Sequence, residues 1–244
     1  MIELKDLTKR YGNVLAVDRV NLHVARGEIF GFLGPNGAGK TTTIRMMGGV
    51  LAPTGGSVVI DGVNMDDDPE SVKRRIGFIP DRPFLYEKLT GMEFMRFSAD
   101  LYGVNGDIFW EKSHNLLIKF GLSDWSNELI EAYSHGMKQR LIISAALLHE
   151  PPVIIVDEPM VGLDPAAIKM VKDLLRDLAN QGTTIFMSTH TLEIAEDICD
   201  RIGIIHKGVL IATGTAGDLK SAAGAQEADL EEAFLKLTEE QIML

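Results

Sequence analysis

The chain has 244 residues, 24 of them Lys or Arg and 35 Asp or Glu, so its formal net charge is −11 and nonspecific binding to nucleic acid is disfavoured. An apolar content of 45% is ordinary for a globular protein, and the single cysteine, Cys199, excludes an internal disulfide framework. No apolar run approaches the roughly 20 residues of a membrane-spanning helix, and the first residues lack the apolar core of a secretory signal, so we expect a cytoplasmic protein.

The first third of the sequence has the pattern of β-strands. Apolar and polar residues alternate over 20–24, and 29–33 is a nearly continuous apolar run, typical of a strand buried on both faces. A helix is predicted over 41–50 from its apolar spacing. Two further strands are predicted over 57–60 and 76–80.

Helices follow one another between residues 88 and 149. Thr90 and Glu93 have the spacing of a capping box, which predicts the start of the first helix. A second helix is predicted over 108–120, and a third over 137–149, where two prolines stop it.

Strands and helices alternate again after residue 150. The expected order is a strand over 153–156, a helix over 164–182, a strand over 183–188, a helix over 191–199, an extended segment over 202–205 and an acidic, amphipathic tail over 227–244. Such alternation indicates a parallel sheet with helical crossovers. We therefore predict an α/β core that is interrupted by a helical subdomain.

A glycine-rich loop follows the buried strand at 29–33. It matches G-x-x-x-x-G-K-[ST] at every fixed position, in the residues Gly34, Pro35, Asn36, Gly37, Ala38, Gly39, Lys40 and Thr41. The glycines allow backbone N–H groups to turn toward one anion, and the following helix adds its positive N-terminal dipole. Lys40 is expected to reach the β- and γ-phosphates, and the Thr41 hydroxyl to bind Mg²⁺. The loop predicts a nucleoside triphosphate site.

Two acidic residues end the predicted strand at 153–156. In a phosphate-loop enzyme, an aspartate in the position of Asp157 holds the Mg²⁺ shell, and an adjacent glutamate such as Glu158 can polarise the attacking water. His190 follows the next strand along the chain. Because ligands bind beyond the carboxyl ends of parallel strands, we expect these side chains to share one site.

Together these residues resemble the ATP-binding subunit of an ABC transporter, over nearly the whole chain. The resemblance implies that residues 34–41 are the Walker A loop, with Thr42 following. It implies further that Asp157 and Glu158 are the Walker B aspartate and the catalytic glutamate, and that His190 is the switch histidine that contacts the γ-phosphate.

The family resemblance extends to three more segments. Tyr11 stands at the position of the aromatic residue that stacks on adenine, and residues 162–164 resemble the D-loop, which crosses the dimer interface. Residues 133–137 stand at the position of the LSGGQ signature, whose serine and backbone amides bind the γ-phosphate held by the opposite subunit. Ser134 and Gly136 match that motif, whereas His135 replaces a glycine.

Asp81 departs from the family pattern at the Q-loop. The family has a glutamine there, which helps to bind Mg²⁺ and links the site to the membrane subunit. An aspartate oxygen is also a hard ligand, so metal contact is compatible with Asp81. The shorter, charged side chain predicts slowed or altered coupling.

The resemblance implies a P-loop NTPase fold: a RecA-like parallel sheet, antiparallel N-terminal strands and an inserted helical subdomain. We expect an ABC ATPase domain over 1–225, with its core at 1–85 and 150–225 and its helical subdomain at about 86–149. A short helical tail is expected over 226–244.

The implied function is ATP-driven transport, most like that of bacterial export systems. The cofactors would be ATP and Mg²⁺, and the partners a transmembrane permease subunit and a second ATP-binding subunit, identical or different, with no nucleic acid. The protein would lie on the inner face of the cell membrane, held there by the permease. Two alternatives are an ABC-type ATPase without a transport role and a weakly hydrolysing regulatory subunit. A GTPase is disfavoured because the sequence has no N-K-x-D motif.

Overall fold

The computed structural model describes residues 1–81, 84–224 and 229–240. Four strands form an antiparallel sheet in the order β2-β1-β4-β5. They are β1 (Ile2–Tyr11), β2 (Val14–Val24), β4 (Gly55–Ile60) and β5 (Val63–Asn64).

A second sheet has six strands in the order β10-β9-β3-β8-β7-β6. They are β3 (Ile29–Leu33), β6 (Ile76–Ile79), β7 (Val153–Asp157), β8 (Thr184–Thr189), β9 (Arg201–His206) and β10 (Val209–Gly214). All are parallel to their neighbours except β10, which pairs antiparallel with β9. Every residue of β3, β7 and β8 is buried, as continuous apolar runs predict for central parallel strands. Their carboxyl ends meet at one edge of the sheet, which positions the site.

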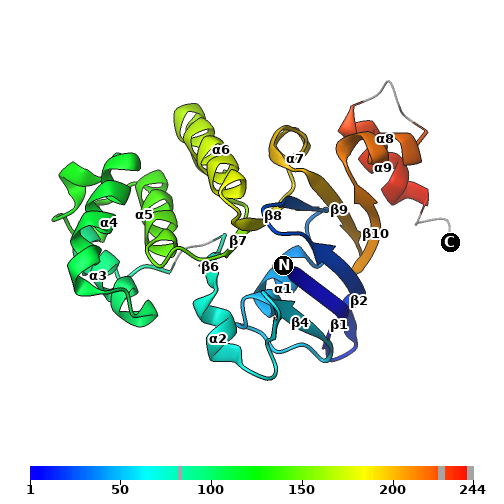
Figure 1. Cartoon of the computed structure of the whole chain (residues 1–244). Coiled ribbons are helices and arrows are strands. Elements are labelled where there is room, and N and C mark those ends of the chain that lie inside the picture. Colours follow the sequence, from blue (N-terminus) through cyan, green and yellow to red (C-terminus); the bar gives the residue numbers. More distant parts are fainter. Residues whose placement is uncertain (82–83, 225–228, 241–244) are drawn as a thin grey trace.

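Some helices lie beside the sheets, and others form a separate cluster (Figure 1). They are α1 (Lys40–Met47), α2 (Pro69–Arg74), α3 (Gly91–Tyr102), α4 (Gly106–Lys119), η1 (Ser123–Trp125), η2 (Ile130–Ala132), α5 (His135–Leu147), α6 (Pro165–Asn180), α7 (Leu192–Ile198), α8 (Ala216–Ala222) and α9 (Leu230–Glu240). Helices α3, α4 and α5 lie between β6 and β7 in the sequence and pack against one another beside the sheet (Figure 1). Among the described residues, no helix is long and apolar enough to cross a membrane.

The predicted fold class is confirmed, together with local features that were expected from single residues. The capping box of Thr90 and Glu93 is present at the start of α3. The tail predicted over 227–244 contains α9, whereas residues 227–228 and 241–244 lie outside the described part of the chain.

Three phenylalanine rings fill the space between the two sheets. Phe186 on β8 packs against Phe30 and Phe32 on β3, with ring centroids 5.7 and 5.3 Å apart, and all three are fully buried. Their cluster includes apolar residues of β1, β2 and β4. Burial of rings of this size contributes strongly to stability, so these contacts fix the phosphate-loop strand β3 against the antiparallel sheet.

The helical cluster meets the core sheet at His149. Its imidazole stacks on the Tyr102 ring with centroids 3.7 Å apart, and its Nε2 lies 3.2 Å from the carbonyl oxygen of Ile76 at the start of β6. Burial lowers the pKa of His149 to about 4, so the ring is neutral at pH 7. The residue therefore joins the end of α5 to α3 and β6 as an uncharged aromatic group.

Candidate active site

A cavity of about 450 Å³ opens at the carboxyl ends of β3, β7 and β8. It is lined by Ala16, Pro35, Asn36, Gly37, Gly39, Lys40, Thr41, Thr42, Asp81, Asp157, Glu158, Val161 and His190. Residues predicted from four separate segments of the sequence thus face one another. Gly34 and Ala38 belong to the same loop but do not line the cavity.

Two glycines of the phosphate loop are required by the fold. A Cβ on Gly34 would collide with the carbonyl oxygen of Ile205 on β9. Gly39 has φ +112°, and a Cβ there would lie 2.6 Å from the carbonyl oxygen of Ala16. Gly39 caps α1 without a side-chain hydrogen bond, so the first N–H groups of this helix are free to receive an anion.

Lys40 lies inside the loop rather than in solvent. Its side chain is buried, and its ammonium donates hydrogen bonds to the carbonyl oxygens of Gly34 at 2.7 Å and Pro35 at 3.4 Å. Burial lowers the pKa of Lys40, and the carboxylates of Glu158 and Asp157 oppose that shift. Within the chain the Lys40 ammonium is bonded to neutral carbonyl oxygens. A bound phosphate would supply a negatively charged partner for it.

The Asp157 carboxylate is held at the end of β7. It is 3% exposed, and the Ser188 hydroxyl donates a hydrogen bond to its Oδ1. The two residues are direct partners in the parallel pairing of β7 with β8. Sequence reasoning missed Ser188 as a site residue, because its role follows from the register of two strands that lie far apart in the chain.

Glu158 and His190 form the second polar pair of the site. Glu158 Oε1 lies 2.8 Å from His190 Nδ1, and the Glu158 N–H donates to the Ser188 carbonyl oxygen at 3.2 Å. Glu158 has φ +51°, a left-handed conformation that is uncommon for a residue with a side chain. Backbone strain of this kind is concentrated at functional sites, because the surrounding structure must hold it.

Asp81 lines both the phosphate cavity and a second cavity. The second cavity is also lined by Thr41 and Asp157, and its apolar wall includes Val50, Phe78 and Phe84. Val50 and Phe84 are 66% and 79% exposed, which is unusual for large apolar side chains. Asp81 therefore faces both the phosphate loop and an exposed apolar surface.

Besides Gly34 and Ala38, three more predicted nucleotide contacts lie outside the cavity. Tyr11 is exposed at the end of β1, with the Lys9 ammonium 5.3 Å from its ring centroid. Ser134 caps α5, its side chain accepting a hydrogen bond from the Met137 N–H at 3.3 Å. Gly136 follows in the first turn of that helix. Within one copy of the chain, α5 does not contribute to the site.

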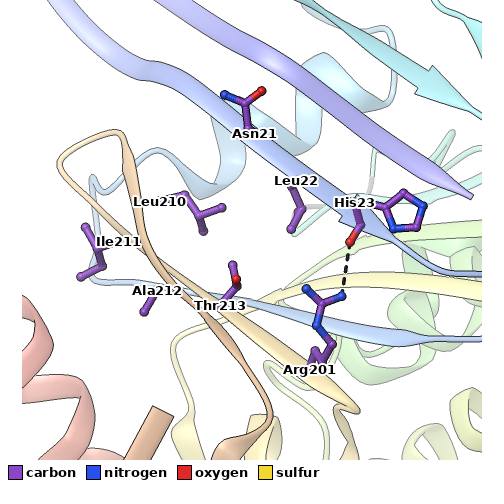
Figure 2. Close-up of a pocket in the computed structure, with 8 residues that line it drawn as sticks. All are labelled: Asn21, Leu22, His23, Arg201, Leu210, Ile211, Ala212 and Thr213. Carbon is purple, nitrogen blue, oxygen red and sulfur yellow. Dashed lines mark hydrogen bonds between the residues drawn. The ribbon is translucent and has the colours of Figure 1, made fainter. Parts of the chain in front are cut away.

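A different pocket, of about 410 Å³, lies between β2 and the β9–β10 hairpin (Figure 2). The guanidinium of Arg201 donates there to the carbonyl oxygen of His23 at 3.3 Å and to Glu28 Oε1 at 2.9 Å. Since Arg201 is already paired and none of the predicted site residues lines this pocket, the phosphate cavity remains the candidate site.

Comparisons with known proteins agree with this assignment. The family model described as ABC transporter matches residues 17–161. The probable multidrug ABC transporter ATP-binding protein YbhF of Escherichia coli (strain K12) is 38% identical over 240 residues, which are 97% of this chain and 41% of the relative. The chain thus spans about two fifths of the length of that relative.

Solved structures share the fold over most of the chain. One, described as the ATP-binding subunit of an ABC transporter, is 37% identical with a TM-score of 0.93, covering 98% of this chain and 99% of the other. Another, the ATP-binding cassette MJ0796 in a dimeric post-hydrolysis state bound to ADP and Pi, is 27% identical with a TM-score of 0.77 over 88% of this chain and 98% of the other. Because the family model matches more than half of its residues, the chain belongs to the ABC transporter family.

Proposed function

We propose that this chain is the ATP-binding and ATP-hydrolysing subunit of an ABC transporter and drives export through a separate transmembrane permease subunit. The observation that carries the proposal is the convergence of the phosphate loop, Asp157, Glu158 and His190 on one cavity. The Escherichia coli relative is named as a probable multidrug ABC transporter protein, which supports export as the direction.

In this account the phosphates of ATP occupy the cavity. Backbone N–H groups of the loop and of α1 bind the phosphate oxygens, and the Lys40 ammonium moves from its carbonyl partners to the β- and γ-phosphates. Tyr11 stacks on the adenine ring. Attraction between the buried ammonium and the phosphates is strong because water is largely excluded around Lys40.

The oxygen ligands at the cavity fit a magnesium ion that arrives with the nucleotide. The Thr41 hydroxyl and the Asp157 and Asp81 carboxylates face the same space. In the part of the chain that the structure describes, no group of three or more His, Cys, Asp or Glu side chains is placed to hold a metal by itself. That donor set suits Mg²⁺, which usually keeps water and phosphate oxygens among its ligands. When bound, the ion neutralises charge on the phosphates.

Glu158 is the proposed general base. Its carboxylate lies beside His190, which orients it and steadies the γ-phosphate, and it accepts a proton from the water that attacks the phosphorus. Glu158 lines the cavity, and its backbone has a left-handed conformation.

The signature segment supplies the other half of a shared site. Gly136 has an ordinary φ, and a Cβ on it would meet its nearest neighbours, the Gly162 oxygen and Leu163 Cδ2, at a comfortable 3.7 Å. Nothing in the packing of the described residues requires a glycine there, which supports close approach by a group from outside the chain. We propose that Ser134 and Gly136 bind the γ-phosphate held by a second copy, and that two copies form a dimer around two ATP molecules.

The proposed organisation follows from the same account. Residues 1–85 and 150–225 form the ATPase core, about 86–149 the helical subdomain, and 226–244 a short tail. The exposed apolar surface beside Asp81 faces the permease subunit at the inner face of the membrane, and the acidic net charge argues against nucleic acid as a partner.

Release of inorganic phosphate from MgATP by the purified protein tests the proposed activity. We expect turnover by the wild type and loss of nucleotide binding and turnover in Lys40→Ala, because this variant lacks the ammonium that pairs with the phosphates. Absence of release from the wild type, with nucleotide still bound, would favour the weakly hydrolysing regulatory subunit suggested by Asp81 and His135.

Asp81→Gln tests the role of the residue between the two cavities. We expect the rate of ATP hydrolysis to change by about threefold or more, basal or in the presence of the permease, because a charge beside the phosphates is replaced by a neutral amide. Asp66→Asn, on an exposed loop, is the matched control. Identical basal and permease-stimulated rates in Asp81→Gln and wild type would refute this role.

A further inference from the structure

The first residue of α5, His135, lies directly against the loop that follows Glu158. A Cβ built on Gly162 would lie 2.5 Å from Cδ2 and 2.7 Å from Nε2 of the His135 ring. Gly162 has φ +76°, so a residue with a side chain would be strained there as well as crowded. The His135 imidazole thus packs directly against the backbone of Gly162. This close contact is possible only because residue 162 has no side chain.

The loop between Glu158 and α6 is short and tightly turned. The Val161 N–H donates to the Glu158 carbonyl oxygen at 3.3 Å, and the Leu163 N–H donates to the Met160 carbonyl oxygen at 3.4 Å. Asp164 then caps α6 by accepting from the Ala167 N–H at 2.8 Å. Both turn hydrogen bonds are long and therefore weak, so contacts from outside the loop decide where its backbone lies.

Gly162 lies only a few residues from Glu158 in the sequence, so a shift of the Gly162 backbone is transmitted to Glu158. On one side the loop is anchored by the cap of α6, and on the other by Glu158 itself, whose N–H is bonded to Ser188 on β8. Glu158 also holds a strained backbone conformation, which the surrounding residues must maintain.

We propose that His135 is a positioning residue that sets the backbone of the 158–164 loop through Gly162, and thereby the position of the Glu158 carboxylate. This rests on the proposed function, in which α5 binds the nucleotide of the second copy while Glu158 serves the chain's own nucleotide. The contact then joins the two sites of the dimer: a phosphate that arrives at the start of α5 moves the ring, and the ring moves the loop. The ring is exposed on its other side, so its removal changes the loop with little effect on the core.

Hydrogen exchange in the nucleotide-free protein tests the positioning role without any dependence on ATP hydrolysis. In His135→Ala we expect amide exchange in a peptide spanning 158–164 to rise about threefold or more, because the weak turn hydrogen bonds open more often once the ring is gone. His135→Asn, which keeps a flat polar group over Gly162, should restore most of the protection. His114→Ala, which removes an exposed histidine from α4, is the matched control and should leave the loop unchanged.

Kinetics of the same variants test the consequence for Glu158. His135→Ala should lower kcat for ATP about fivefold or more with KM within about twofold, since misplacing a general base affects chemistry more than binding, and His135→Asn should recover the rate. Exchange in His135→Ala equal to that of the wild type overturns the proposal. If the wild type hydrolyses no ATP but exchange rises as expected, the proposed function fails while the positioning role of His135 stands.

Discussion

Glu158→Gln is expected to bind MgATP, to lose ATP turnover by a factor of about 10² to 10⁴, and to accumulate as a dimer. The glutamine has nearly the same shape but cannot accept the proton of the attacking water, so the phosphates stay intact between the two subunits. The 2.8 Å contact with His190 can persist through the amide oxygen. Light scattering with and without MgATP measures the dimer, and phosphate release measures turnover.

Glu150 provides a matched control within the same chain. It is also a glutamate with φ +51°, but it is paired with Lys112 at 3.0 Å and lies outside the phosphate cavity. Glu150→Gln repeats the change of side chain in the same backbone conformation and should keep wild-type turnover. A Glu158→Gln protein that remains monomeric at saturating MgATP would contradict the shared-site account.

Gly136→Ala should abolish most ATP turnover, by about tenfold or more, while the free energy of unfolding stays equal to that of the wild type or rises slightly. An added methyl group fits the chain's own packing, whose nearest atoms would lie 3.7 Å away, and alanine favours a helix over glycine. It would instead block close approach of the γ-phosphate of a second copy to the backbone of α5. Thermal unfolding and phosphate release measure the two effects.

The control for this change is Gly217→Ala. Gly217 also lies in the first turn of a helix, α8, with an ordinary φ, and among the residues that the structure describes no atom lies closer than 3.8 Å to an added Cβ. It should show the same stability effect with no loss of turnover. Full activity in Gly136→Ala would remove the main structural support for the signature role of α5.

The parts of the candidate site that a sequence alone can predict are those determined by local geometry. The phosphate loop requires glycines at fixed positions between a strand and a helix, and Asp157 stands at the end of an apolar strand, so both can be recognised without tertiary information. The predicted α/β fold class is confirmed by the parallel order of β9, β3, β8, β7 and β6.

Other features depend on contacts between distant segments. The pairing of Ser188 with Asp157 follows from the register of β7 and β8. The helix predicted over 41–50 ends earlier, at Met47, because Gly49 has φ +64°, a left-handed conformation that cannot continue the helix. Strand β10 and helix α2 were not predicted, since their short segments show no strong periodicity.

The division of the chain into core, helical subdomain and tail remains a proposal, as do the roles of the individual site residues. Ser134 and Gly136 show why. In one copy, Ser134 caps and Gly136 begins a helix that does not line the phosphate cavity, and only a second subunit would bring them to a nucleotide. A property that belongs to an assembly leaves only a partial signal in the sequence and structure of one chain.

Mixing two inactive variants tests the shared site most directly. Lys40→Ala lacks a working phosphate loop but keeps its signature segment. Gly136→Ala lacks a working signature segment but keeps its phosphate loop. In a mixed dimer, the loop of the second variant meets the signature of the first and completes one site. We expect an equal mixture to release phosphate from MgATP faster than the sum of the two variants alone. A mixture no more active than that sum, under conditions in which the wild type dimerises and hydrolyses ATP, would contradict it.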